Sequence, residues 1–307
     1  MENVINYDVL EVDKENEVVR YNDHLHKYWT KSSNQSCISV TTLIHNFTTF
    51  DESFWSSYKA FESLLGVDGF KIYKNKLLDS KIFNKQYLEQ ANISEEIFNS
   101  KRQEILDEWA VKRDASCVRG TAIHREHELG HLNGETPELK QLGLGGKFTT
   151  NVTNKIELGS QNVYPELLIS WISADGKLRL AGQADLIIID GNDLIVVDYK
   201  TNKSIDMKAF FDKKTKKSQT MKYPLNDLQD TNFWHYTMQL STYAWMIKKA
   251  FPGINIKKLM LIHYDHDGNC TPYDCEYHEA HVERMLSYYK KELEHDEFKK
   301  SREKIIF

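Results

Sequence analysis

The stretch Gly182–Lys203, which reads GQADLIIIDGNDLIVVDYKTNK, decides the fold of this chain. Two apolar runs, Leu186–Ile189 and Leu194–Val197, flank the segment Asp190–Asp193, whose residues are typical of tight turns. Two such runs joined by so few turn residues predict a β-hairpin made of buried strands.

Charged residues lie at the ends of both predicted strands. Asp185 precedes the first apolar run, while Asp198 and Lys200 follow the second. A charge beside apolar strands needs a partner or a metal ion, because leaving it unpaired there is costly. The hairpin therefore predicts a site for a divalent metal ion.

The turn fixes which residues of the hairpin face each other. A two-residue loop at Gly191–Asn192 places Asp185 opposite Asp198. The same register places Gln183 opposite Lys200, and alternation along the strands then puts all four side chains on one face.

A third strand extends this row of side chains. Residues from about Val163 to Ser173 are predicted to form it, and a two-residue loop at Asp175–Gly176 places Glu166 opposite Asp185. Carboxylates in such a row repel one another until a cation binds, and Mg²⁺ prefers oxygen ligands. A slip of one residue in either loop would move these side chains to opposite faces.

Three further motifs accompany the hairpin in a fixed order. They are Gly120–His124 upstream, Ala181–Asp185 at the first hairpin strand and Gln239–Tyr243 downstream. Together with the triplet Asp198–Lys200 they resemble the PD-(D/E)XK nuclease superfamily and, within it, the RecB-like exonuclease branch of phage and bacterial type. The likeness extends from about residue 115 to residue 265, and Ala184 stands where the superfamily usually has proline.

The resemblance implies an α/β fold with a restriction-endonuclease-like core, in which helices flank a mixed central sheet. A region of N-terminal strands and a helical cap is expected at residues 1–113. The nuclease core is expected at residues 114–307, with a lysine-rich loop at residues 201–222 and a C-terminal helix.

The resemblance also implies the composition of the active site. One or two Mg²⁺ or Mn²⁺ ions would be bound by the side chains of His124, Asp185 and Asp198 and by the backbone carbonyl of Tyr199. Lys200 would act in catalysis together with the two aspartates.

Further residues are expected to support this site. Gln239 and Tyr243 lie four positions apart on a predicted helix, hence on one face, and would position the lysine or the DNA. Glu166 would add an acid, because some members of the branch carry one on the preceding strand. Gln183 and Glu128 would contact the metal ligands and hold them in position without binding the ion themselves.

These expectations describe a metal-dependent deoxyribonuclease that hydrolyses phosphodiester bonds. The resemblance favours an exonuclease that acts on DNA ends in recombination, repair or replication. The alternatives are a structure-specific or non-specific DNA endonuclease of the same fold and a DNA-binding protein without catalysis.

A competing motif lies on the predicted upstream helix. Residues His127–His131 read H-E-L-G-H, the helical pattern with which metalloproteases bind zinc. Its two histidines would bind the ion and Glu128 would activate a water molecule. Glu157 is a candidate third ligand, although no pattern around it supports that role.

The distribution of charge matters more than its total. The net charge of −5 does not indicate nucleic-acid binding, but lysines are concentrated between the hairpin and the Gln239 helix. Such a loop can follow phosphates, and its phenylalanines can stack on bases. The expected DNA-binding residues are Lys203, Lys208, Phe210, Phe211, Lys213, Lys214, Lys216, Lys217 and Lys222.

Cysteine usage and hydropathy indicate the cellular setting. Four cysteines suggest no disulfide framework, and only Cys270 and Cys275 lie downstream of the hairpin. Relatives with an iron–sulfur cluster use three downstream cysteines, so no cluster is expected. Without a predicted membrane span, we expect an intracellular protein, cytoplasmic in a bacterial or phage-infected cell, with an organelle or the nucleus as alternatives. DNA is the expected partner, no membrane is expected as one, and the sequence does not identify protein partners.

Overall fold

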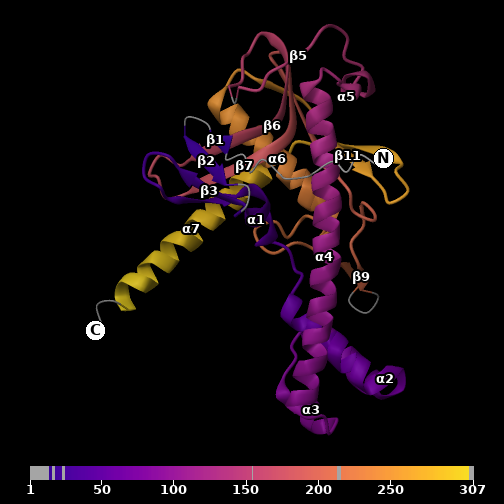
Figure 1. The fold of residues 1–307 in the computed structure, drawn as a ribbon. Helices are drawn as coiled ribbons and strands as arrows, with labels where there is room; N and C mark the ends of the chain where they lie inside the picture. Colours follow the sequence, from indigo (N-terminus) through magenta and orange to yellow (C-terminus); the bar gives the residue numbers. More distant parts are fainter. Residues whose placement is uncertain (1–13, 16–17, 23–24, 154, 213–215, 304–307) are drawn as a thin grey trace, which may run out of the picture. The chain divides into compact units, whose positions relative to one another are not determined.

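The computed structural model of the 307-residue chain describes residues 14–15, 18–22, 25–153, 155–212 and 216–303 (Figure 1). Among these residues, no helix is both long enough and apolar enough to cross a membrane.

The chain divides into two compact units. Residues 1–48 and 123–307 form the first unit, and residues 49–122 form the second. This division differs from the boundary expected at residue 113, which grouped the N-terminal strands with the helical cap. The physical reason is that Ile38 and Ser39 of one N-terminal strand pair in parallel with the first strand of the predicted hairpin.

A mixed sheet of ten described strands organises the first unit. Its strands are β1 (Lys14–Glu15), β2 (Val19–Asn22), β3 (Lys27–Thr30), β4 (Ser36–Ser39), β5 (Thr149–Thr150), β6 (Ser160–Ile172), β7 (Arg179–Gly191), β8 (Asp193–Lys200), β11 (Asn255–Tyr264) and β12 (Cys270–Cys275). Neighbours follow the order β1-β2-β3-β4-β7-β8-β11-β12, while β6 also pairs with β7, and β5 pairs with β6. The pairs β4–β7, β5–β6 and β8–β11 are parallel and the others are antiparallel.

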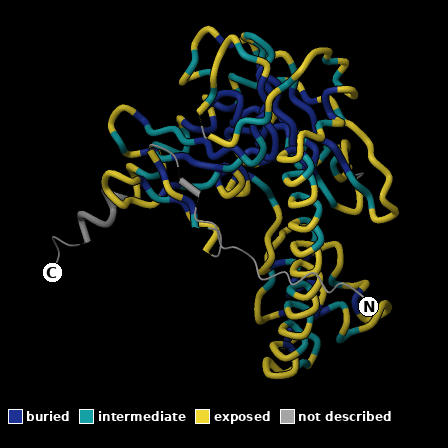
Figure 2. The backbone as a smooth tube through the Cα atoms, turned by 45° about the horizontal axis from the view of Figure 1, so that its top comes forward, coloured by how far each residue is buried: buried dark blue, intermediate teal, exposed yellow. Residues whose placement is uncertain are grey.

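The predicted hairpin, β7 and β8, lies in the interior of this sheet. Ile187 and Ile189 pack in one apolar cluster, whereas Leu186 and Ile188 pack in another that includes Met260. Neighbouring residues thus face opposite sides, and both sides are covered. This explains why the strands read as continuous apolar runs without polar alternation. Figure 2 shows the buried residues concentrated in the strands of the sheet.

The described part of the first unit also contains a two-stranded sheet, β9 (Phe211–Asp212) and β10 (Lys217–Ser218), and four helices that lie wholly within it: α1 (Val40–His45), α5 (Pro137–Gln141), α6 (Asn232–Ala250) and α7 (Glu279–Glu303). Helix α6 contacts β8, β11, α1 and α7, and residues 237–247 along it are buried. The Thr231 hydroxyl caps its first turn by accepting a hydrogen bond from the Trp234 amide (3.3 Å). The predicted α/β core, a mixed sheet flanked by helices, is confirmed.

The described elements of the second unit are helices. It contains α2 (Glu52–Ser80), α3 (Lys85–Gln90) and residues 95–122 of α4 (Glu95–Leu132). Its own aromatic core includes Phe54, Phe61, Phe70, Tyr87 and Phe98. Helix α4 ends inside the first unit, where its last turns carry the histidines of the candidate site.

Candidate active site and metal centre

The β7–β8 hairpin has the predicted register. Its pairs extend from the turn to Leu186 and Val197, as a two-residue loop at Gly191–Asn192 requires. Gly191 has a φ of 66°, a left-handed conformation that glycine adopts without strain and that tight hairpin loops use. The prediction for this turn is confirmed.

Strand β6 also pairs with β7 in the predicted register. The pairs on both sides of Glu166 keep that register, so Glu166 lies opposite Asp185. Glu166 has a φ of 50°, which is uncommon for a residue with a side chain. Such strained backbone persists only where its surroundings hold it, and it clusters at functional sites.

His124 from α4 meets this row of acids. Its Nδ1 lies 3.4 Å from Asp185 Oδ1 and 3.8 Å from Glu166 Oε1. One ligand atom from each of the three residues lies within 4.8 Å of the others. Gln183 supports the group, because its Nε2 donates to Glu166 Oε2 at 2.5 Å. An imidazole nitrogen and two carboxylates at this spacing can surround a divalent cation.

The backbone of Tyr199 orients two members of this group. Its amide donates to Asp185 Oδ2 at 2.7 Å, and its carbonyl lies 3.1 Å from His124 Nε2. A carbonyl only accepts, so Nε2 carries a proton and Nδ1 is the nitrogen that faces the carboxylates. The carbonyl that was expected to bind the metal thus contacts the opposite nitrogen of the ring.

Electrostatics indicate that this group favours a positive charge. Burial alone would lower the pKa of His124, but Asp185 and Glu166 outweigh burial and raise that pKa to about 11. Burial would likewise raise the pKa of Asp185, yet His124 and Lys200 hold it below its ordinary value. Without a metal ion, a proton on His124 therefore supplies the positive charge.

Asp198 and Lys200 form a buried ion pair beside this group. Asp198 is 2% exposed, and its Oδ2 lies 2.5 Å from Lys200 Nζ. Its Oδ1 accepts a hydrogen bond from Gln239 Nε2 at 3.1 Å. Burial raises the pKa of Asp198 to about 6, Lys200 opposes this rise, and Asp185 adds to it. Oδ2 is buried, and its partner is the Lys200 ammonium group.

Gln239 and Tyr243, the predicted pair on α6, have different surroundings. Gln239 contacts Asp198, whereas Tyr243 is 3% exposed, so Tyr243 has no open surface for DNA. A Cβ added to Gly182 would lie 2.7 Å from Cε1 of the Tyr243 ring. The glycine of the first motif is therefore needed for the tyrosine of the last to pack against β7.

Glu128 and the predicted DNA-binding loop are the remaining predicted groups. Glu128 forms an ion pair with Arg125 at 2.6 Å. In the lysine-rich loop, Phe210 and Phe211 are 72% and 52% exposed. The exposed described lysines are Lys203, Lys208, Lys216, Lys217 and Lys222. Two more members of the predicted DNA-binding set, Lys213 and Lys214, lie outside the described residues.

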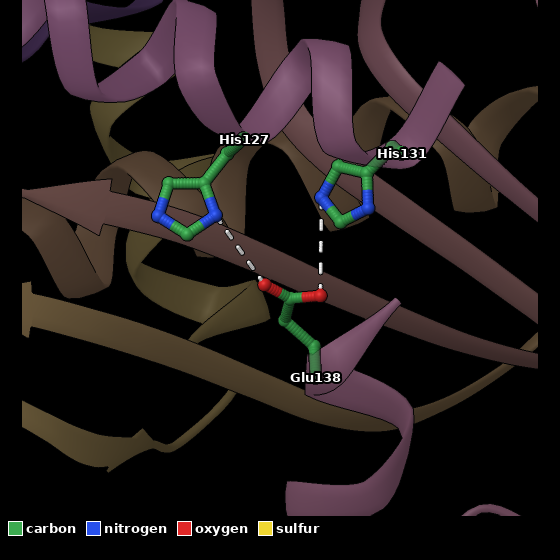
Figure 3. A group of neighbouring side chains, drawn as sticks. All are labelled: His127, His131 and Glu138. Atoms are coloured by element: carbon green, nitrogen blue, oxygen red, sulfur yellow. Dashed lines mark ion pairs between the residues drawn. The ribbon is translucent and has the colours of Figure 1, made fainter. Parts of the chain in front are cut away.

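The H-E-x-x-H motif gains a third group, but it is Glu138 from α5 rather than the expected Glu157. Glu138 lies near both His127 and His131 (Figure 3). Sequence reasoning missed it because the turn after α4, which no motif marks, brings α5 back to the histidines. The available signal was weak: Pro137 and then Glu138 are typical of the first turn of a helix.

Comparison with known proteins gives one family. Residues 73–304 match the family model of the PD-(D/E)XK nuclease superfamily. A solved structure described as "Crystal structure of SSO0001" aligns with 24% identity over 43% of this chain, at a TM-score of 0.26. The alignment covers 50% of that chain. No curated protein matches the sequence.

Proposed function

Because the chain belongs to the PD-(D/E)XK nuclease superfamily, we propose that it is a metal-dependent deoxyribonuclease whose active site lies across β6, β7 and β8. The observation that carries the proposal is the convergence of Glu166, Asp185 and His124 within ligand distance of one another. The buried pair of Asp198 and Lys200 belongs to the same site, because both residues interact electrostatically with Asp185.

One or two Mg²⁺ or Mn²⁺ ions fit this donor set. Carboxylate oxygens are the ligands that hard cations prefer, and oxygens of Glu166 and Asp185 lie within 4.8 Å of each other and of a nitrogen of His124. The proposed ligands are His124, Glu166, Asp185 and Asp198. The Tyr199 carbonyl, which was expected to bind the metal, contacts His124 Nε2 instead. A bound ion of this kind would stabilise the negative charge that develops at phosphorus during hydrolysis.

Lys200 is proposed to act as a cation rather than as a base. Burial would lower its pKa, but Asp198 and Asp185 outweigh burial and raise it. The ammonium group therefore keeps its proton and can donate a hydrogen bond to a phosphate oxygen. Gln239 would hold the Asp198 carboxylate in place while the phosphodiester is attacked.

We further propose that the enzyme is an exonuclease of the RecB-like branch, acting on intracellular DNA in recombination, repair or replication. The order of the histidine, G-x-x-D, D-x-K and Q-x-x-x-Y motifs supports this assignment. The exposed lysines and phenylalanines that follow Lys200 would contact the DNA strand.

The test uses end-labelled linear DNA and closed circular DNA, each single- and double-stranded. Wild type, Lys200→Ala and a matched control, Lys258→Ala, are assayed with Mg²⁺, Mn²⁺ or EDTA. Lys258 is a suitable control because it lies on the neighbouring strand β11 and pairs only with the exposed Asp274 among the ion pairs of the described residues.

We expect degradation of linear DNA that requires a metal ion, is lost in Lys200→Ala and persists in Lys258→Ala. Equal activity of Lys200→Ala and wild type would contradict the proposed site. Cleavage of closed circles would assign the enzyme to the endonucleases.

A further inference from the structure

His127, His131 and Glu138 form a second group of potential metal ligands (Figure 3). His127 and His131 project from the last turns of α4, and Glu138 lies in the first turn of α5. His127 Nδ1 is 3.6 Å from Glu138 Oε1, and His131 Nε2 is 3.9 Å from Glu138 Oε2. Three ligand atoms, one from each residue, lie within 4.8 Å of one another.

One oxygen of the Glu138 carboxylate lacks a hydrogen-bond donor among the described residues. Glu138 and His131 are each 1% exposed, and Glu138 Oε2 accepts no hydrogen bond from the described residues. Burying a carboxylate oxygen without a donor is costly, so such an oxygen indicates a missing ligand. Oε2 faces His131 in Figure 3.

The contacts of His131 favour positive charge at Nε2. His131 Nδ1 lies 3.0 Å from the Glu135 carbonyl, His131 Nε2 lies 3.0 Å from Tyr199 Oη, and Tyr199 Oη donates to Glu138 Oε1 at 2.9 Å. Because the hydroxyl proton is given to Glu138, it is not available to Nε2. A proton or a metal ion at Nε2 completes these contacts.

The donor set is that of a zinc site. Two imidazole nitrogens and one carboxylate oxygen suit Zn²⁺, whereas Mg²⁺ prefers oxygen ligands alone. Tetrahedral zinc with bonds near 2.1 Å separates its ligand atoms by about 3.4 Å. His127 Nδ1 lies 3.6 Å from Glu138 Oε1 and His131 Nε2 lies 3.9 Å from Oε2, and one ligand atom from each residue lies within 4.8 Å of the others, so the three side chains must move closer together around an ion. The hydrogen bond from His131 Nδ1 to the Glu135 carbonyl already turns Nε2 toward the site.

We propose that His127, His131 and Glu138 bind one Zn²⁺ ion at a site separate from the nuclease centre. The ion would join the end of α4 to α5 and so stabilise the wall of the core against which Tyr199 packs. The Tyr199 ring stacks on His127, with ring centroids 4.1 Å apart.

The site is not that of a metalloprotease, although it uses the H-E-x-x-H motif. Glu128, which would activate water in a protease, is paired with Arg125 at 2.6 Å. Two of the three proposed ligands are almost completely buried, which leaves no open side for a peptide. The ion would therefore be structural.

The test measures zinc content in the full-length chain after chelation, reloading with Zn²⁺ and removal of excess metal. Glu138→Gln removes the carboxylate charge with little change in shape, and Glu128→Gln is the matched control within the same motif. Asp185→Asn removes a ligand of the nuclease centre and separates the two sites. Thermal unfolding with Zn²⁺ and with Mg²⁺ provides a second measurement.

We expect one tightly held zinc ion in wild type, Glu128→Gln and Asp185→Asn, and at least about 100-fold weaker zinc binding in Glu138→Gln, a loss of two factors of ten in Kd. Zinc should raise the unfolding temperature of the first three proteins only. The proposal is overturned if wild type holds no zinc, or if zinc is lost in Asp185→Asn and kept in Glu138→Gln.

A measurement on wild type alone covers the case in which Glu138→Gln fails to fold. Anomalous diffraction at the zinc edge from crystals grown with Zn²⁺ locates the ion directly. A peak between His127 and His131 supports the site. A peak only at His124 and Asp185, or no peak, overturns it.

Discussion

The two groups of potential metal ligands differ in the elements that carry them. Glu166 and Asp185 of the nuclease centre come from paired strands, where register fixes their spacing. The proposed zinc ligands come instead from the end of one helix and the start of another. Strand register can be calculated from loop lengths, whereas a helix-to-helix contact depends on the path of a turn. Glu166 and Asp185 of the first group were therefore predictable from register, whereas Glu138 of the second group was not.

The groups also differ in chemistry and are joined by one residue. Oxygen atoms dominate the nuclease centre, while nitrogen atoms dominate the group around Glu138. Tyr199 contacts both, because its backbone meets His124 and Asp185 and its hydroxyl meets Glu138. Whether the groups act separately can be tested by variants that affect one of them.

The largest effect is expected from Asp185→Asn. Removing one carboxylate charge weakens binding of a hard cation and leaves the positive charge on His124 without its nearest partner. We expect cleavage of linear DNA to fall by about 10²- to 10³-fold, a range typical for the loss of an electrostatic group in an active site. Zinc content should not change.

Asp190→Asn is the matched control for this prediction. Asp190 lies on the same strand but next to the turn, where it contacts Gln161 and Lys257. The rate at which Asp190→Asn cleaves linear DNA should stay within a few-fold of wild type. Loss of zinc together with cleavage in Asp185→Asn would mean that the two groups form one site.

Gly182→Ala should have the next largest effect, on stability. The new Cβ would lie 2.7 Å from a carbon of the buried Tyr243 ring, so α6 or β7 must shift. Overpacking of this kind lowers the free energy of unfolding by about 1–3 kcal/mol. Urea unfolding would measure it, and cleavage should fall as Gln239 moves with α6. Gly253→Ala is the control, because a Cβ there meets open space. Unchanged stability of Gly182→Ala would show that the contact is easily relieved.

Sequence patterns were sufficient for the sheet and the acidic row for an identifiable reason. Leu186–Ile189 and Leu194–Val197 are buried on both faces, so they are apolar throughout and mark their own ends. The loop at Gly191–Asn192 has two residues, because Asp190 pairs with Asp193. This loop length sets the register of the hairpin. Local information therefore determined this part of the fold.

Other features depend on contacts between distant segments. Strand β4 joins the sheet through the pairing of Ile38 and Ser39 with β7, a contact that no local pattern indicates. Glu166 adopts a left-handed conformation without the glycine that usually marks one. Glu138 reaches the histidines only because α4 ends near Leu132 and the chain turns back. Each requires knowledge of the packed structure.

A smaller effect is expected from the pH dependence of the metal-free protein. Burial raises the pKa of Asp198 to about 6, above the value near 4 of an unfolded chain. Folding therefore favours its protonated form, and this stability is present below pH 4 and lost as the pH rises through about 6. Asp198→Asn lacks this titration, so from pH 4 to pH 7 it should gain about 2 kcal/mol relative to wild type.

Urea unfolding in EDTA at several pH values measures this difference. Mn²⁺ should remove it by stabilising wild type alone, because only wild type retains the carboxylate that binds the ion. Parallel pH profiles of the two proteins in EDTA would show that Asp198 is already ionised at low pH. That outcome would contradict the raised pKa of Asp198 in the nuclease centre.

The smallest effect is expected from Tyr199→Phe, which removes only the hydroxyl that contacts the group around Glu138. The backbone contacts with His124 and Asp185 remain, so cleavage should stay within about 3-fold of wild type, below 1 kcal/mol in activation free energy. Metal-free stability should fall by about 1–2 kcal/mol, because Glu138 Oε1 loses its donor. Saturating Zn²⁺ should recover most of that loss. Tyr223→Phe, at a 66% exposed position, controls for loss of a hydroxyl. A 100-fold loss of cleavage at unchanged stability would show that the hydroxyl serves the nuclease centre itself, and that the two groups work as one.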